Sequence, residues 1–267
     1  MIFDIVIPVG SIDIEVFKKQ LTFTIKNIIG FRNIYIITNK TYFFEVERND
    51  VFFVDEDIFH LFIDYLKREY GEKNKRNGWF FQQLIKFYVS FYIENISEKY
   101  LVIDSDVFFL NPTIFFDENS LPMYSYGYEY HLPYFEHMKK LHPMLKKQIL
   151  VENPKEFSGI CHHMIFDKKV LSELFYYVEN YQLEKNNIKK PFWRFFLDCV
   201  DFDDRRLFRS GCSEYEIYFN YILLFHKEHI RIRKLKFDNF FRDYQNIEKY
   251  TNQYDYIAYH YYHRIPL

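Results

Sequence analysis

The chain has 267 residues, enough for one large domain with a substantial core, and its formal net charge is −2 with 27% charged residues. A net charge this close to zero excludes functions that depend on electrostatic binding to nucleic acid or to an anionic membrane. No apolar stretch reaches the roughly 18 residues of a membrane span. The start, MIFDIVIPVG, lacks the basic region of a signal peptide, and the three cysteines are widely spaced. We therefore expect a cytoplasmic protein in a reducing compartment, with no transmembrane segment.

In the first half of the chain, short apolar runs alternate with helix-length segments. We expect strands at residues 3–8, 33–38, 51–54 and 100–103, and helices at 13–25 and from about Gly78 onward. Strands separated by helices are typical of a parallel, doubly wound sheet, in which the strand ends gather at one edge.

The second half is less regular. We expect strands at residues 121–130 and 256–259, and a glycine-containing segment at 157–166 that leads into another strand. The charged, Asn-rich stretch at 184–190 is typical of a surface loop. No internal repeat or low-complexity tract is visible.

The fourth predicted strand ends abruptly in Asp104-Ser105-Asp106. Four apolar residues before the two acids indicate a strand that is buried on both faces of a parallel sheet. Ligands of open α/β sheets bind just beyond the carboxyl ends of the strands. Two carboxylates at that place can share one hard divalent cation with the phosphate oxygens of a ligand.

The predicted helix GWFFQQLIKFYVSFYIEN is apolar except for a narrow polar stripe of Gln82, Gln83, Lys86 and Ser90. At about 100° per residue these side chains fall on one side of the helix. The stripe is either the solvent face of an amphipathic helix or the polar edge of a mostly buried helix that borders a cleft. In the second case Lys86 could bind a diphosphate, with Arg76 as a second candidate.

The segment SGCSEYEIYFNYILLF begins a helix at which Ser213 and Glu216 match a capping box, so Glu216 has a structural role. Glu214 shares a helix face with apolar side chains and is expected to point toward protein. Its burial favours a catalytic or binding role, and the alternative is a favourable charge at the helix N-terminus.

Histidines complete the candidate residues. His260 directly follows the last predicted strand and His263 lies three residues further on, while His162 and His163 stand in FSGICHHMIF. Imidazole together with carboxylate suits Mn²⁺ better than Mg²⁺.

Taken together, the start of the first strand, GWFFQQLIKFY, IDSD, SGICHHMIF, SEYEIYFNY and the terminal histidine resemble the GT-A fold of nucleotide-sugar-dependent glycosyltransferases with a DxD motif, in particular small bacterial or viral members. The resemblance spans nearly the whole chain. It implies an α/β fold in which a Rossmann-like, mostly parallel sheet is flanked by helices. It also implies a single catalytic domain over 1–267, with a nucleotide-sugar-binding half over about 1–110 and an acceptor-binding half over about 111–267.

The resemblance also implies roles for individual residues. A metal ion, Mn²⁺ or Mg²⁺, would be held by Asp104, Asp106 and His260. The donor, by family preference a UDP-sugar, would be bound by Pro8, Val9, Asn39, Arg76, Gln83, Lys86, Ser105 and His263. The acceptor, a glycan or glycoconjugate, would be bound by Gly159, His162 and His163. Glu214 matches the acidic residue that serves as base in inverting members, with Glu216 as the alternative.

The expected function is therefore metal-dependent hexosyl or pentosyl transfer to a glycan hydroxyl, with inversion at the sugar. Two other classes remain open. Haloacid-dehalogenase-type phosphohydrolases share an apolar strand followed by two acids, but they usually have Thr or Val where this chain has Phe108. A non-catalytic glycan-binding protein on the same scaffold is the third possibility.

Overall fold

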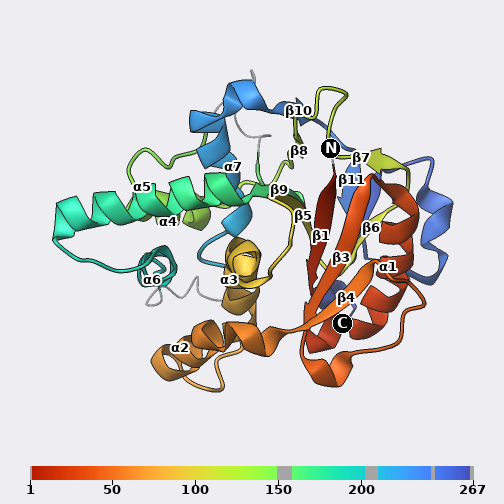
Figure 1. The fold of residues 1–267 in the computed structure, drawn as a ribbon, viewed down its shortest axis with the longest axis horizontal. Helices are drawn as coiled ribbons and strands as arrows, with labels where there is room; N and C mark the ends of the chain where they lie inside the picture. Colours follow the sequence, from red (N-terminus) through yellow and green to blue (C-terminus); the bar gives the residue numbers. More distant parts are fainter. Residues whose placement is uncertain (1, 149–157, 202–209, 242–243, 265–267) are drawn as a thin grey trace. The chain divides into compact units, whose positions relative to one another are not determined.

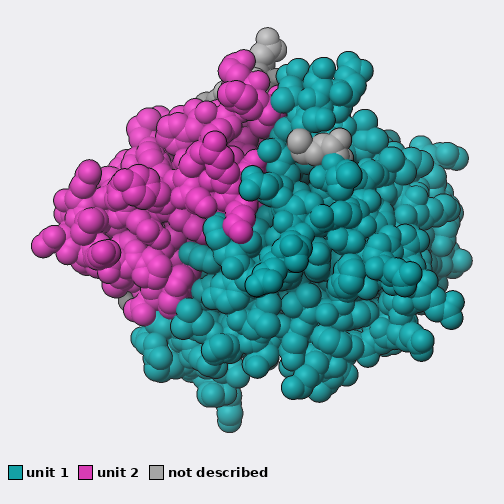
Figure 2. All heavy atoms as spheres, viewed as in Figure 1, with its two compact units in different colours: residues 1–125, 162–165, 231–267 teal, residues 126–161, 166–230 magenta. Residues whose placement is uncertain are grey.

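The computed structural model describes residues 2–148, 158–201, 210–241 and 244–264. The chain forms two compact units, which are coloured separately in Figure 2. Unit 1 comprises residues 1–125, 162–165 and 231–267, and unit 2 comprises residues 126–161 and 166–230.

The main sheet has the strand order β4-β3-β1-β5-β9 (Figure 1). Its strands are β1 (Phe3–Pro8), β3 (Phe31–Thr38), β4 (Val51–Asp55), β5 (Lys99–Ile103) and β9 (His163–Asp167). β1 pairs in parallel with both β3 and β5, and β3 pairs in parallel with β4. All six residues of β1 are buried, as the apolar run predicted. The mostly parallel α/β sheet expected from the sequence is therefore confirmed.

Shorter strands surround this sheet. They are β2 (Ile28–Ile29), β6 (Val107–Phe109), β7 (Thr113–Ile114), β8 (Met123–Ser125), β10 (Arg231–Arg233), β11 (Phe237–Asn239) and β12 (Tyr256–Ala258). β12 runs antiparallel to β6 and parallel to β11, so residues 256–258 lie beside the strand that follows the end of β5. The strand expected at 121–130 is wrong in length: β8 covers three residues, because its parallel pairing with β10 ends at Ser125.

The helices of unit 1 are α1 (Ile14–Asn27), α2 (His60–Tyr70) and α3 (Asn77–Tyr92). In α3 the polar stripe is not a solvent face, because Gln83, Lys86 and Ser90 are each at most 3% exposed. The interpretation as a mostly buried helix is confirmed. The aromatic ring of Tyr88 packs against Phe62 of α2, at 5.1 Å between ring centroids.

Buried amides attach α1 to β6. Gln20 donates a hydrogen bond to the carbonyl of Val107 at 2.9 Å, and Asn27 donates one to the carbonyl of Phe109 at 2.6 Å. Around these bonds lies an apolar cluster from α1, β6, β12 and the segment before β12: Val16, Phe23, Phe108, Leu110, Phe240, Ile247, Tyr250, Ile257 and Tyr259. The position of β6 is thus fixed by both hydrogen bonds and apolar burial.

The helices of unit 2 are α4 (Leu132–Leu141), α5 (Lys168–Asn186), α6 (Phe192–Asp198) and α7 (Glu214–Phe225). The loop expected at 184–190 is wrong for its first residues, since α5 continues to Asn186 and ends where Asn187 adopts a left-handed conformation (φ 52°). Asn tolerates that conformation better than most residues, so it sets the end of the helix. Within the described residues, no helix is long and apolar enough to cross a membrane.

Asp4 of β1 is fully buried and accepts hydrogen bonds from Arg32 Nη2 at 2.6 Å and from the backbone amide of Ser97 at 2.7 Å. Without Asp4 the backbone amides of Asn33 and Ser97 lose their acceptor, whereas Arg32, which is 43% exposed, stays accessible to water. We predict that Asp4→Ala lowers the free energy of unfolding by about 1–3 kcal/mol for each amide left without an acceptor, measured by urea denaturation. Arg48→Ala, which breaks an exposed pair with Asp50, should cost less than about 1 kcal/mol. Equal losses in the two variants would contradict this account of the sheet.

Candidate functional site

The site is built on the turn that joins β5 to β6. Asp104, Ser105 and Asp106 form this turn at the carboxyl end of β5, and the amide of Val107 closes it on the carbonyl of Asp104 at 3.2 Å. The turn is fixed from two sides, because the amide of Asp104 donates to the carbonyl of His162 at 3.0 Å and the carbonyl of Asp106 accepts from Tyr259 at 2.9 Å. Both acids are therefore held by backbone hydrogen bonds as well as by side-chain contacts.

Asp104 is paired with a buried lysine. Lys86 Nζ lies 2.6 Å from Asp104 Oδ1, and Nδ1 of His162 lies 3.7 Å from Asp104 Oδ2. Burial alone would raise the pKa of Asp104, but Lys86 and His162 outweigh it and hold the pKa well below its ordinary value. Asp104 is therefore ionised at neutral pH.

Asp106 lies against the C-terminal segment. His260 Nδ1 and Arg264 Nη2 each lie 3.3 Å from Asp106 Oδ2. The antiparallel register of β12 on β6, which pairs Ala258 with Val107, brings the residues after β12 to this place. The sequence expectation that His260 and Asp106 lie together is met by this geometry.

Two further residues belong to this cluster and were not singled out from the sequence. Asp13, just after β1, accepts from Ser105 Oγ at 3.1 Å and from Arg264 Nη1 at 2.7 Å. Burial, and then repulsion from Asp106, raise the pKa of Asp13. Asp13 could have been found by applying to β1 the rule that was applied to β5, namely that acids just beyond a parallel strand lie at the ligand-binding edge. Arg264 carried no comparable signal.

Three of the expected donor-binding residues lie at the same edge of the sheet. Pro8 ends β1, the amide of Val9 donates to the carbonyl of Ile37 at 2.8 Å, and Asn39 follows β3 and accepts a hydrogen bond from the amide of Thr41. Parallel pairing places these chain ends side by side.

The other expected donor contacts are more scattered. Gln83 is buried in α3, one turn before Lys86. Arg76 precedes α3 and lies over the Trp79 ring at 4.7 Å, about 15 Å along the helix axis from Lys86 at a rise of 1.5 Å per residue. The side chain of His263 lies outside the described part of the structure.

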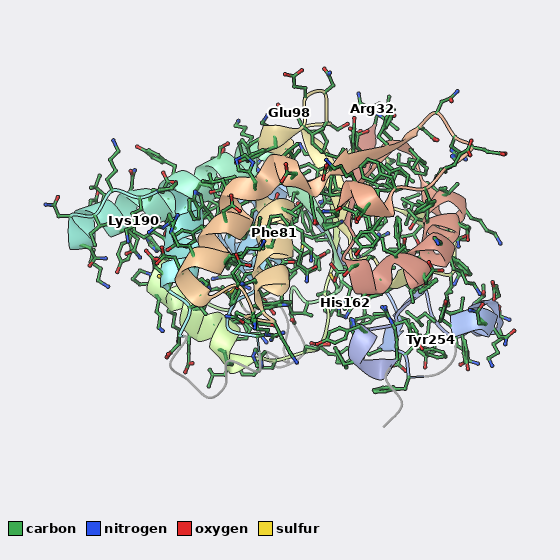
Figure 3. The ribbon with its side chains drawn as sticks, turned by 90° about the horizontal axis from the view of Figure 1, so that it is seen from below. Arg32, Phe81, Glu98, His162, Lys190 and Tyr254 are labelled. Carbon is green, nitrogen blue, oxygen red and sulfur yellow. The ribbon has the colours of Figure 1, made fainter. Side chains whose placement is uncertain are left out.

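The adjacent histidines have different surroundings. His163 is 2% exposed and its ring lies among the rings of Phe109, Phe115 and Tyr256, at centroid distances of 5.0–5.5 Å. His162, labelled in Figure 3, is 6% exposed and its ring lies 4.6 Å from that of His260. The structure thus brings His162 to the acidic turn and places His163 in an aromatic core.

The remaining candidates lie in unit 2. Glu214 is 4% exposed in the first turn of α7, as the helix projection predicted. Ser213 caps the helix through the amide of Glu216, and the buried Glu216 carboxylate accepts hydrogen bonds from Ser158 and Asn220. Burial raises the pKa of Glu216. Of the expected capping box, the bond from the Glu216 amide to Ser213 is present, whereas the Glu216 carboxylate bonds Ser158 and Asn220.

Gly159 approaches the backbone of α7 closely. A Cβ atom at this position would lie 2.7 Å from the carbonyl oxygen of Tyr215 and 2.9 Å from Cβ of Phe219. Only glycine fits there without a shift of the backbone.

The donor set around Asp106 fits a divalent cation in part. Two ligand atoms bound at right angles to one ion at about 2.1 Å lie about 3 Å apart, close to the 3.3 Å between His260 Nδ1 and Asp106 Oδ2. Among the described residues, no three His, Cys, Asp or Glu side chains are already gathered as a metal cage. Asp104 and Asp106 are instead contacted by Lys86 and Arg264.

Comparisons with known proteins place this geometry in context. The model of a family described as "Family of unknown function (DUF6492)" matches residues 16–260. No curated protein sequence matches the chain.

Among solved structures, the apo form of mouse xyloside xylosyltransferase 1 is similar over 100% of both chains, with a TM-score of 0.50 and 10% identity. The galactosyltransferase LgtC in complex with donor and acceptor sugar analogs has a TM-score of 0.46 and 12% identity, over 96% of this chain and 87% of that chain. The fold is thus similar to GT-A glycosyltransferase structures.

The pairing of Lys86 with Asp104 yields a pH-dependent prediction. Because the pKa of Asp104 is lowered in the folded state, the pair stabilises the protein above the ordinary Asp value of 3.8, and this stability is lost as the pH falls below it. We predict that Lys86→Met lowers the free energy of unfolding by about 3–5 kcal/mol at pH 7. The difference from wild type should shrink below pH ~4.

Urea unfolding at pH 7, 5 and 3 measures both effects. Lys26→Met, on the exposed face of α1, is the matched control and should change little at any pH. A Lys86→Met deficit that stays constant across this range would contradict the assignment of the charge pair.

Proposed function

Because the chain belongs to the DUF6492 family, whose function is unknown, we propose its activity from the site itself. The protein is a glycosyltransferase that moves a sugar from a nucleotide sugar to a hydroxyl of a glycan or glycoconjugate. The favoured donor is a UDP-sugar. Transfer depends on a divalent cation, for which Mn²⁺ is favoured, and inverts the configuration at the anomeric carbon of the sugar.

The observation that carries this proposal is the acidic turn at the carboxyl edge of the sheet. Asp104 and Asp106 follow β5 at the edge where open α/β sheets bind nucleotides, and two cationic side chains and two imidazoles contact them. The three carboxylates of Asp104, Asp106 and Asp13 and the two cationic side chains of Lys86 and Arg264 carry a formal charge of −1 together. A divalent cation bound together with the diphosphate of a nucleotide sugar, which carries about two negative charges, leaves that balance unchanged.

Asp106 and His260 would hold the cation, and Asp104 would support it. When bound, a divalent cation supplies Lewis-acid stabilisation of the negative charge that develops on the leaving diphosphate. Its binding requires Arg264 to share or release Asp106 Oδ2, which Arg264 contacts at 3.3 Å.

The chain's own residues supply the rest. Lys86 keeps Asp104 ionised and adds positive charge beside the leaving group, and Arg264, once moved from Asp106, adds a second positive charge. Glu214 takes the proton of the acceptor hydroxyl as the hydroxyl attacks the anomeric carbon. Its burial at the start of α7, rather than exposure to solvent, supports this role.

We predict that the wild-type protein releases UDP from UDP-sugars in the presence of Mn²⁺, and that Asp106→Asn abolishes this release while leaving the fold intact. Thermal stabilisation by UDP and Mn²⁺, about 2.7 kcal/mol at 100 times the dissociation constant, should also disappear. Asp64→Asn, on the exposed face of α2, is the control and should keep both. Release of inorganic phosphate would favour a phosphohydrolase, and glycan binding without turnover would favour a binding protein. Full activity in Asp106→Asn would contradict the site.

A second prediction distinguishes Glu214 from Glu216. Glu214→Gln cannot accept a proton, so kcat should fall by about 10²–10⁴ with little change in donor binding. Glu216→Gln loses one acceptor for the bonds from Ser158 and Asn220, so it should cost about 1–3 kcal/mol of stability while kcat stays near wild type. Steady-state kinetics and urea unfolding of both variants test this. The reverse pattern would assign the base to Glu216, and activity in both would favour retention over inversion.

A further inference from the structure

We propose that His162 is a ligand of the divalent cation through Nε2, and that Asp104 acts on the cation through His162 by orienting its ring. This inference rests on the proposed function. It gives His162 the role of metal ligand instead of acceptor binding, and Asp104 the role of orienting His162 instead of binding the metal. The cation would be held by Asp106, His260 and His162, all within unit 1.

The first observation is an unsatisfied atom. His162 is 6% exposed, and among the described residues its Nε2 is a buried polar atom with no hydrogen-bond partner. A buried polar atom without a partner costs about 1–3 kcal/mol. His162 also adopts a left-handed backbone conformation (φ 61°), which costs a non-glycine residue about another 1–2 kcal/mol. Proteins retain strained or unsatisfied residues mainly at active sites and at sites that bind a ligand.

The second observation fixes which nitrogen is available. His162 Nδ1 faces Asp104 Oδ2 at 3.7 Å, so the carboxylate favours the proton on Nδ1 and leaves the lone pair on Nε2. Histidines that bind metals almost always direct their other nitrogen to a carboxylate or carbonyl in this way. The Asp104 carboxylate is held in place by its ion pair with Lys86 and by the hydrogen bond from the Asp104 amide to the carbonyl of His162.

The third observation is the distance to the second histidine. Two imidazoles bound at right angles to one ion at about 2.1 Å have ring centroids about 4.6 Å apart. The rings of His162 and His260 are 4.6 Å apart, at an interplanar angle of 62°. Since no three such side chains are gathered about one point in the described structure, the rings must turn on binding to close the shell.

Two imidazoles and one carboxylate form a donor set that favours Mn²⁺ and later transition metals over Mg²⁺. Mn²⁺ is therefore the probe, because its electron spin reports directly on coordinated nitrogen. Pulsed EPR of the wild-type protein with Mn²⁺, with and without UDP, should show couplings from two imidazole nitrogens. This readout does not depend on turnover.

His162→Asn is the test variant, since Asn tolerates the left-handed backbone and provides no imidazole. We expect it to lose one of the two nitrogen couplings and to bind Mn²⁺ about 10-fold or more weakly. Asp104→Asn should keep both couplings but weaken binding by about 10–100-fold, as outer-shell changes do. His229→Asn, the same change at an exposed histidine, is the control and should match wild type.

The outcomes separate this inference from the proposed function. Unchanged couplings and affinity in His162→Asn, with UDP release intact in the wild type, would overturn the role of His162 alone. Two imidazole couplings in a protein that turns over no nucleotide sugar would support the cation site and overturn the transferase. A wild type that binds no Mn²⁺ with or without UDP would overturn both.

Discussion

An ion pair between the buried Lys86 and the partly exposed Asp104 sets the geometry on which the rest of the site depends. Lys86 lies in the middle of a helix that is buried on most sides, and its ammonium group reaches the first residue after β5 at 2.6 Å. Neither charge can be left alone in such surroundings, so the pair holds α3 and the end of β5 in register. Asp106 and Ser105 follow in the same turn and take their directions from it.

The C-terminal segment completes what the first half of the chain begins. β12 pairs antiparallel with β6, which follows the acidic turn, and this register delivers His260 and Arg264 to Asp106 from more than 150 residues away in sequence. Gln20 and Asn27 of α1 hold the other edge of the same short strand through its carbonyls. The acidic cluster is therefore a product of tertiary pairing and depends on both ends of the chain.

The parts of this arrangement that follow from local sequence were predictable. Unbroken apolar runs gave the main parallel strands, because a strand buried on both faces needs no polar alternation. For α3 the thin polar stripe left a solvent face and a buried polar edge as alternatives, and the structure shows the second. The cap predicted at Ser213 does begin α7. The short β8 was misjudged, since its length is set by its pairing with β10 and not by its own residues.

Site residues could be predicted only where the local sequence alone marks the end of a strand. Asp104 directly follows β5 and His260 comes two residues after β12, and His260 lies against Asp106 as expected. Arg264 was missed because nothing near it in sequence signals a partner at Asp13, 251 residues away. The position of His162 beside Asp104 was not predicted, because its left-handed backbone and its contact with Asp104 arise from how the chain enters β9, which no local pattern encodes.

The measurement that tests the central claim most directly is anomalous X-ray diffraction from crystals grown with Mn²⁺ and UDP. The account predicts one strong anomalous peak within bonding distance of the Asp106 carboxylate and the His260 imidazole, with diphosphate density beside it at the carboxyl edge of the sheet. A peak elsewhere, or ordered diphosphate remote from the Asp104–Asp106 turn, would contradict it.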